Sequence, residues 1–177
     1  MFNQLHNHLN NHKILAEEQF GFRSDFTTNN AIYKLVNETL SALNSKLMVG
    51  GIFFDLKKAF DCLNHNILLS KLQFYGVHGK AKSWFESYLN NRYMRVHISE
   101  GGSNQMNFSA WDKITDGVPQ GSVLGPLLFL IYVNDLPNTV NEKTVPILFA
   151  DDTSIIVKSS NLKDFQNNMA IAFKSMV

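Results

Sequence analysis

Three aspartates occupy positions in the sequence where a carboxylate is costly. Asp55 directly follows the apolar run 49–54 (VGGIFF), and 96 residues later Asp151 and Asp152 separate two further apolar runs. Burying a carboxylate is unfavourable unless it is paired or binds a cation, and adjacent acids repel each other unless a cation lies between them. Oxygen ligands with no Cys or His nearby favour Mg²⁺ or Mn²⁺ over Zn²⁺. Two such ions about 4 Å apart form the clamp used for phosphoryl and nucleotidyl transfer.

Hydrophobic periodicity predicts the elements that have to position these acids. Helices are expected at residues 28–44, 56–75, 80–89 and 122–134, and a last one from Leu162 to Met176. Strands are expected at 49–54, 145–150 and 153–157, and a hairpin pairs 92–98 with 105–108 around the turn-prone 100–104. Helices and strands alternate without a regular βαβ rhythm, which predicts an α+β fold.

Composition indicates one folded domain, or one domain with a fragment of another. The chain has 177 residues, of which 45% are hydrophobic and 18% charged, so it is too apolar to be disordered. The longest apolar run, 123–133, is far shorter than the roughly 20 residues of a membrane span, and no secretory signal follows Met1. We therefore expect an intracellular chain without membrane contact. The single Cys62 excludes a disulfide framework and is expected to be a small core residue.

The charges are segregated although the net charge is only +1. Seven Lys or Arg against two acids lie between Lys57 and Arg95, whereas seven acids against two Lys lie between Glu100 and Asp152. A basic segment suits a phosphate backbone and an acidic one suits metal ions. From the residues alone two plainer interpretations stay open: the charge runs are solvated faces, and the acid pair is an ordinary polar hairpin turn.

Four blocks of residues resemble a known family. FFDLKKAFD (53–61), GVPQGSVLGP (117–126) and FADD (149–152) occur in that order, with QFGFR (19–23) upstream. Together they resemble the reverse transcriptases of non-LTR retrotransposons, of the jockey and long-interspersed-element kind. The resemblance covers about 5–168, nearly the whole chain.

The resemblance implies a right-hand polymerase palm, a ferredoxin-like sheet backed by helices, with partial fingers and no thumb. In that scheme 1–47 belong to the fingers, 48–65 and 119–177 to the palm, and 66–118 to an insertion between fingers and palm. The implied function is an RNA-directed DNA polymerase core that transfers nucleotides from a dNTP to a DNA primer 3′-OH on an RNA template. An earlier fingers segment, the primer grip and the thumb are expected outside this chain, so we expect little activity from it alone.

The metal ligands implied by the resemblance are Asp55, Asp151 and Asp152, with the backbone carbonyl of Leu56 as a further ligand. The three aspartates match the three palm carboxylates, which bind two Mg²⁺ or Mn²⁺ ions.

The resemblance also implies a nucleotide site. Phe60 matches the aromatic gate that excludes a ribose 2′-OH, although a core aromatic is the alternative at that spacing. Gln120 and Gly121 match the loop that contacts the incoming nucleotide and the template, and Ala150 matches the small residue beside the sugar. Arg23 matches the Arg of its block, with a template or fingers contact as one reading and an ordinary surface Arg as the other.

Two other functions remain open at this point. An RNA-directed RNA polymerase shares the palm, but those enzymes typically place an acid near Phe60 and a Gly where Ala150 stands. A catalytically inactive nucleic-acid-binding remnant is the second alternative. Asp61 and His65, four apart on one face of the predicted helix, suit either a metal or acid–base pair or a structural hydrogen bond.

Overall fold

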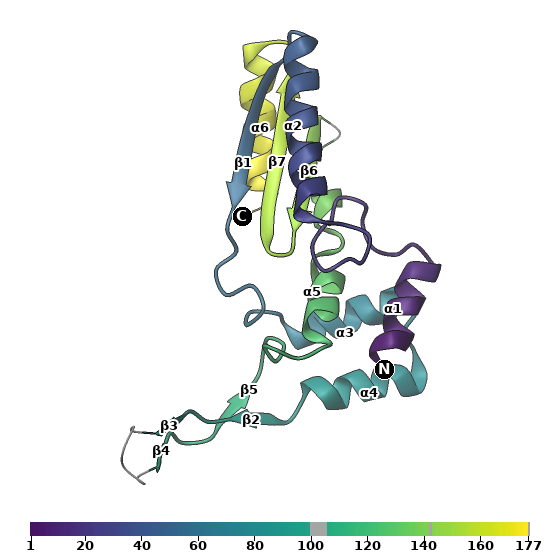
Figure 1. Cartoon of the computed structure of the whole chain (residues 1–177), viewed down its shortest axis with the longest axis vertical. Coiled ribbons are helices and arrows are strands. Elements are labelled where there is room, and N and C mark those ends of the chain that lie inside the picture. Colours follow the sequence, from purple (N-terminus) through teal and green to yellow (C-terminus); the bar gives the residue numbers. More distant parts are fainter. Residues whose placement is uncertain (100–105, 142, 177) are drawn as a thin grey trace.

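A three-stranded antiparallel sheet forms one end of the molecule (Figure 1). Its strands are β1 (Met48–Phe54), β6 (Thr144–Phe149) and β7 (Asp152–Ser159), in the spatial order β1-β7-β6. The structure, a computed structural model, describes residues 1–99, 106–141 and 143–176. All three predicted strands are confirmed, including the hairpin that joins the last two.

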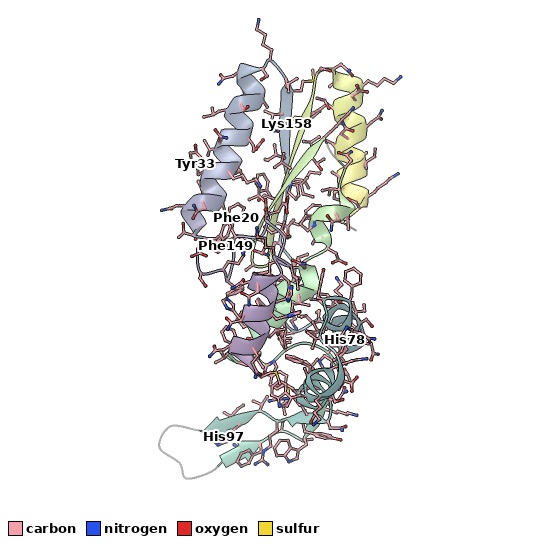
Figure 2. The ribbon with its side chains drawn as sticks, turned by 90° about the vertical axis from the view of Figure 1, so that its right-hand side faces the viewer. Phe20, Tyr33, His78, His97, Phe149 and Lys158 are labelled. Atoms are coloured by element: carbon pink, nitrogen blue, oxygen red, sulfur yellow. The ribbon has the colours of Figure 1, made fainter. Side chains whose placement is uncertain are left out.

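Helices α2 (Thr28–Asn44) and α6 (Leu162–Lys174) cover opposite faces of this sheet (Figures 1 and 2). Because side chains alternate along a strand, β7 contributes Ile156 to the α2 side and Ile155 and Val157 to the α6 side. All three are buried, which makes β7 the centre of this layered core.

Helix α2 approaches the sheet through small side chains. Ala31 and Ala42 are buried, whereas its large apolar residues are mostly exposed: Ile32, Tyr33, Val36, Leu40 and Leu43. An ion pair between Glu38 of α2 and Lys158 of β7 adds a polar tie across the same layer. The helices predicted at 28–44 and after Leu162 are both confirmed.

A second core lies below the sheet and consists of helices. It joins α1 (Phe2–Asn11), α3 (His65–Phe74), α4 (Gly79–Leu89) and α5 (Gly125–Val133), followed by the short helix η1 (Leu136–Thr139). Seven of the nine residues of α5 are buried, which explains why this helix is apolar all round. In the described part of the chain, no helix is long and apolar enough to cross a membrane.

Periodicity did not predict α1, although the signal is present. Leu5 and Leu9 lie one turn apart and are buried against the helical core. Asn and His fill most of its other positions, and both are weak helix formers, so tertiary packing rather than intrinsic propensity holds this helix.

A hairpin arm projects from the helical core at the opposite end from the sheet (Figure 1). It consists of two short ladders, β2 (Arg92–Met94) with β5 (Asp112–Ile114) and β3 (His97–Ser99) with β4 (Met106–Phe108). The predicted pairing of 92–98 with 105–108 is confirmed for the outer ladder and wrong for the inner one, where 92–94 pair with 112–114 because the hairpin extends beyond Phe108. The predicted turn at 100–104 lies outside the described residues.

Three predictions about the central segments are wrong. The helix expected from Leu56 begins only at His65, because residues 57–61 form turns and the Asn64 side chain caps α3 by accepting hydrogen bonds from the backbone N–H groups of Asn66 and Ile67. The helix expected from Ser122 begins at Gly125. Cys62 is exposed rather than in the core, since the turn that carries it lies on the surface.

Candidate active site

The sheet register brings the three aspartates to one end of the sheet. Phe54, the last residue of β1, pairs with Thr153, so Asp55 leaves the sheet beside Asp152, the first residue of β7. Asp151 lies in the short turn between β6 and β7. Asp55 and Asp152 are exposed and Asp151 is half-buried. Antiparallel pairing thereby brings together two acidic motifs that are 96 residues apart in the sequence.

These carboxylates share a sheet end without forming a closed cluster. Among residues 1–99, 106–141 and 143–176, no three His, Cys, Asp or Glu side chains come together as a metal-ion site. The type of donor nevertheless fits a hard divalent cation, because Mg²⁺ and Mn²⁺ prefer carboxylate and carbonyl oxygens. The backbone of Leu56 lies just beyond the last pair of the β1–β7 ladder, next to Asp55.

A buried glutamine holds the turn that carries Asp151. Gln19 is 3% exposed, and its Oε1 accepts hydrogen bonds from the backbone N–H of Ala150 (3.0 Å) and of Gly21 (2.8 Å). Its Nε2 donates to the carbonyl of Ala150 at 3.3 Å. Ala150 has φ +57°, a left-handed conformation that costs a non-glycine residue about 1–2 kcal/mol. The Gln19 amide therefore stabilises a strained turn from both of its polar ends.

The segment around Gln19 also extends the sheet edge. The backbone N–H of Phe20 donates to the carbonyl of Leu148 (2.8 Å), and the N–H of Leu148 donates to the carbonyl of Glu18 (2.9 Å). Phe20 and Phe149 belong to the apolar cluster between α2 and the sheet and lie near its lower end in Figure 2. A Cβ on Gly21 would lie 2.2 Å from the backbone nitrogen of Ala150, so this close approach requires glycine.

Arg23 stabilises the same loop from the other side. Its guanidinium donates to the carbonyls of Ala16 (2.7 Å) and Gln19 (3.2 Å), and its Cζ lies 4.3 Å from the ring centroid of Phe26. Burial lowers the pKa of the Arg23 guanidinium, while nearby carboxylates act in the opposite direction. These contacts occupy Arg23 within the loop, and a contact with template remains a prediction.

The turn after Asp55 interlocks with the loop that carries Gln120. The N–H of Gly117 donates to the carbonyl of Leu63 (2.7 Å), and the N–H of Val118 donates to the carbonyl of Phe60 (2.9 Å). The buried ring of His65 forms a 2.7 Å hydrogen bond with the carbonyl of Gly117. His65 is thus structural, and because Asp61 precedes α3, the two residues do not share a helix face as predicted.

Asp61 instead contacts the predicted nucleotide-binding glutamine. Gln120 Nε2 donates to Asp61 Oδ1 at 2.8 Å, and both side chains are exposed. This hydrogen bond holds the Gln120 amide in one orientation and leaves its carbonyl oxygen free for another partner. Gly121, the next residue, has φ +77° and open space where a Cβ would lie.

Phe60 is half-buried between two other phenylalanines. Its ring stacks on Phe129 of α5, with centroids 4.5 Å apart, and meets the exposed Phe22 edge-on at 5.9 Å. One side of Phe60 therefore packs on the helical core, which fixes the ring position. Its action on a sugar stays a prediction.

The sequence did not predict the contacts of two residues of this site, because it identified Gln19 only as part of the block QFGFR and paired Asp61 with His65. Gln19 and Asp61 act on Ala150 and Gln120 through contacts that span 131 and 59 residues. For Gln19 a signal was available, since a polar residue directly before the apolar Phe20 and a Gly suggests a buried amide with backbone partners. For Asp61 no local signal points to Gln120.

Comparison with known families gives a match over almost the whole chain. A family model described as "Reverse transcriptase (RNA-dependent DNA polymerase)" matches residues 1–176. The "RNA-directed DNA polymerase from mobile element jockey" of Drosophila melanogaster is 35% identical over 162 residues, which cover 85% of this chain and 16% of that protein. The "Probable RNA-directed DNA polymerase from transposon BS" of the same species is 31% identical over 170 residues, or 89% of this chain and 17% of that protein. The chain thus spans about a sixth of the length of these relatives.

Two solved telomerase structures share the fold. Apo telomerase from Candida tropicalis aligns with a TM-score of 0.66 at 17% identity, covering 95% of this chain and 32% of that one. Telomerase from Candida albicans, in complex with a fragment of telomeric RNA, aligns with a TM-score of 0.55 at 14% identity over the same shares. The mixed α/β arrangement is therefore one found in known telomerases.

Replacing Gln19 by leucine is expected to destabilise the chain by about 1–3 kcal/mol, because two backbone N–H groups lose their acceptor in a buried place. Urea unfolding followed by circular dichroism measures the free energy of unfolding. The control is Gln166→Leu on the exposed face of α6, which should change it by less than about 0.5 kcal/mol. Equal stability of the two variants would contradict the clamp.

Proposed function

The chain belongs to the reverse transcriptase family, and we propose that it forms the palm, with part of the fingers, of a non-LTR retrotransposon RNA-directed DNA polymerase. The observation that carries this proposal is the β1–β7 register, which places Asp55 beside Asp152 with Asp151 in the adjoining turn. In this proposal 48–65 and 119–177 are palm, whereas 1–47 and 66–118 contribute to fingers and to the insertion between them. The reaction extends a DNA primer on an RNA template with dNTPs.

The exposed sheet end suits the metal ions of such a polymerase. Asp55, Asp151 and Asp152, with the carbonyl of Leu56, would hold two Mg²⁺ or Mn²⁺ ions, which offset the repulsion between neighbouring carboxylates. When bound, two such ions lower the pKa of an attacking hydroxyl and stabilise a leaving pyrophosphate. The protein's own contribution is to keep the turn that carries Asp151 fixed through Gln19 and Gly21.

Phe60 and Ala150 are proposed to select the sugar. The stack on Phe129 holds the Phe60 ring in place, so that a ribose 2′-OH would collide with it whereas a deoxyribose would not. Phe60 is aromatic where an RNA-directed RNA polymerase would have an acid, which favours DNA synthesis. The small side chain of Ala150 leaves room beside the sugar.

Gln120 and Gly121 are proposed to contact the incoming nucleotide and the template. Open space beside Gly121 allows a ligand to approach the backbone closely. Asp61 acts as a positioning residue, because its hydrogen bond orients the Gln120 amide.

Asp151→Asn is expected to reduce primer extension by at least about 10²-fold and to spare nucleic-acid binding, because it removes a metal ligand without changing shape. The isolated chain should extend only weakly, since small misplacement of a primer end costs about 10²-fold. A primer-extension assay with magnesium and dNTPs measures both effects. The control is Asp164→Asn on α6, near the opposite end of β7. Extension that survives Asp151→Asn would remove the metal mechanism, and binding without metal-dependent extension by the unaltered chain would favour an inactive nucleic-acid-binding remnant.

Phe60→Val is expected to raise ribonucleotide incorporation about 10- to 200-fold relative to deoxynucleotides, because only sterics exclude the 2′-OH. Single-nucleotide insertion with matched rNTP and dNTP gives the ratio. Phe74→Val, which alters a largely exposed ring (83%) on α3, serves as the control. An unchanged ratio in Phe60→Val would show that Phe60 is only a core aromatic.

Asp61→Ala is expected to raise the KM for dNTP about tenfold with a smaller effect on kcat, since the Gln120 amide loses its charge-assisted hydrogen bond. Gln120→Ala should have a similar effect, and the double variant should be no worse than either single one. Steady-state insertion kinetics measure all three variants. Additive losses in the double variant would show that the two side chains act separately.

A further inference from the structure

The hairpin arm exposes six large apolar or aromatic side chains to solvent. In the described part of the chain its strands pair only with one another. The exposed residues are Tyr93 (58%), Met94 (60%), Val96 (62%), Ile98 (63%), Phe108 (46%) and Trp111 (62%). A two-stranded hairpin is marginally stable in water, and such a concentration of exposed apolar groups marks an interaction surface.

Four planar groups on the arm lie in contact, and we call them the arm stack: Arg95, His97, Phe108 and Trp111. The rings of His97 and Phe108, a cross-strand pair, are 4.7 Å apart and inclined by 21°. The Cζ of Arg95 lies 3.9 Å from the centroid of Phe108 and 4.6 Å from that of Trp111. His97 marks this place on the arm in Figure 2. All four side chains are exposed, so the stack offers flat faces and edges to a ligand.

The backbone holds the stack together where the two ladders meet. The N–H of Val96 donates to Ser109 Oγ (2.9 Å), and the N–H of Ser109 donates to the carbonyl of Val96 (3.0 Å). These two hydrogen bonds pair the two sides of the arm between its ladders, next to Arg95 on one side of the hairpin and close to Trp111 on the other.

The charges near the stack favour a polyanion. The described part of the arm contains three cations, Arg92, Arg95 and Lys113, and one acid, Asp112. Glu100, the other acid of the segment, lies outside the described residues. Lys113 is paired across the ladder with Tyr93, which puts a cation beside a further exposed ring. Aromatic rings and guanidinium planes that stack on unpaired bases, with cations for the phosphates, are the features by which proteins bind single-stranded RNA.

The arm is continuous with the proposed nucleotide loop. A cavity of about 820 Å³ at the base of the arm is lined by Arg92, Tyr93 and Lys113 from the arm and by Asp61, Pro119 and Gln120 from the loop. An RNA strand bound along the arm could therefore continue through this cavity to Gln120. This continuity favours RNA over a protein as the occupant.

We propose that the arm stack binds unpaired RNA, as a docking surface for template outside the active site. The identification of that RNA as template rests on the proposed function, whereas the stacking site itself does not.

The test is the affinity of the 177-residue chain for a fluorescein-labelled oligouridylate of about twelve nucleotides, measured by fluorescence anisotropy. Phe108→Ala combined with Trp111→Ala should raise the Kd at least about tenfold, the equivalent of roughly 1.4 kcal/mol. Phe108→Tyr with Trp111→Phe should restore binding, because the flat faces return. Tyr33→Ala with Phe74→Ala, which removes two exposed rings elsewhere, should leave the Kd unchanged. Lys113→Ala should lower the slope of log affinity against log salt by about one.

The outcomes separate this inference from the proposed function. Loss of RNA binding in the alanine pair, in a chain without metal-dependent extension, would uphold the arm and refute the proposed catalytic activity of this chain. Metal-dependent extension with unchanged RNA binding in the alanine pair would refute the arm alone. Equal affinity for the oligouridylate and for duplex RNA would overturn stacking as the mode of binding. Self-association through the arm in place of RNA binding, detected by sedimentation, would overturn the proposal in favour of protein docking.

Discussion

The antiparallel pairing of β1 with β7 is the interaction on which the rest of the candidate site depends. It joins a segment that ends at Asp55 to one that begins at Asp152, and no local contact could do so across such a distance in sequence. The pairing is specified by burial, because a slip of one residue would move Ile155 and Val157 from the α6 face to the α2 face. The location of the carboxylates is therefore a consequence of how the core packs.

Two further constraints make the sheet end a defined place. Gln19 holds the turn at Ala150 from inside, and the backbone of Gly21 packs against the same turn. On the other side, Gly117 has φ +81°, and a Cβ there would lie 2.7 Å from the carbonyl oxygen of Asp61. Both glycines let one backbone segment pack closely on another, so the acidic turn and the loop proposed to contact the nucleotide are each held by a segment far away in sequence.

The molecule is built from two cores with the site between them. The sheet core, centred on β7, carries the carboxylates, whereas the helical core, centred on α5, carries Phe60 through its stack on Phe129. The hairpin arm extends from the helical core (Figure 1), and none of its described residues belongs to a buried core cluster. The proposed chemistry, the proposed nucleotide selection and the proposed binding surface of the arm thus lie in parts with different packing, which allows substitutions to affect them separately.

The sequence by itself determined the three strands of the sheet, the helices α2 and α6 and the hairpin around Asp151 and Asp152, because strand and helix periods and turn residues are local signals. The order of four residue blocks was sufficient for the family. Only the tertiary structure decided that α3 begins at His65, that Asp61 binds Gln120 rather than acting with His65, and that Cys62 is exposed. It also decided that Gln19 clamps the acidic turn. Each of these features depends on hydrogen bonds or packing between distant segments, and a polar residue in a one-dimensional pattern does not indicate which distant backbone group will satisfy it.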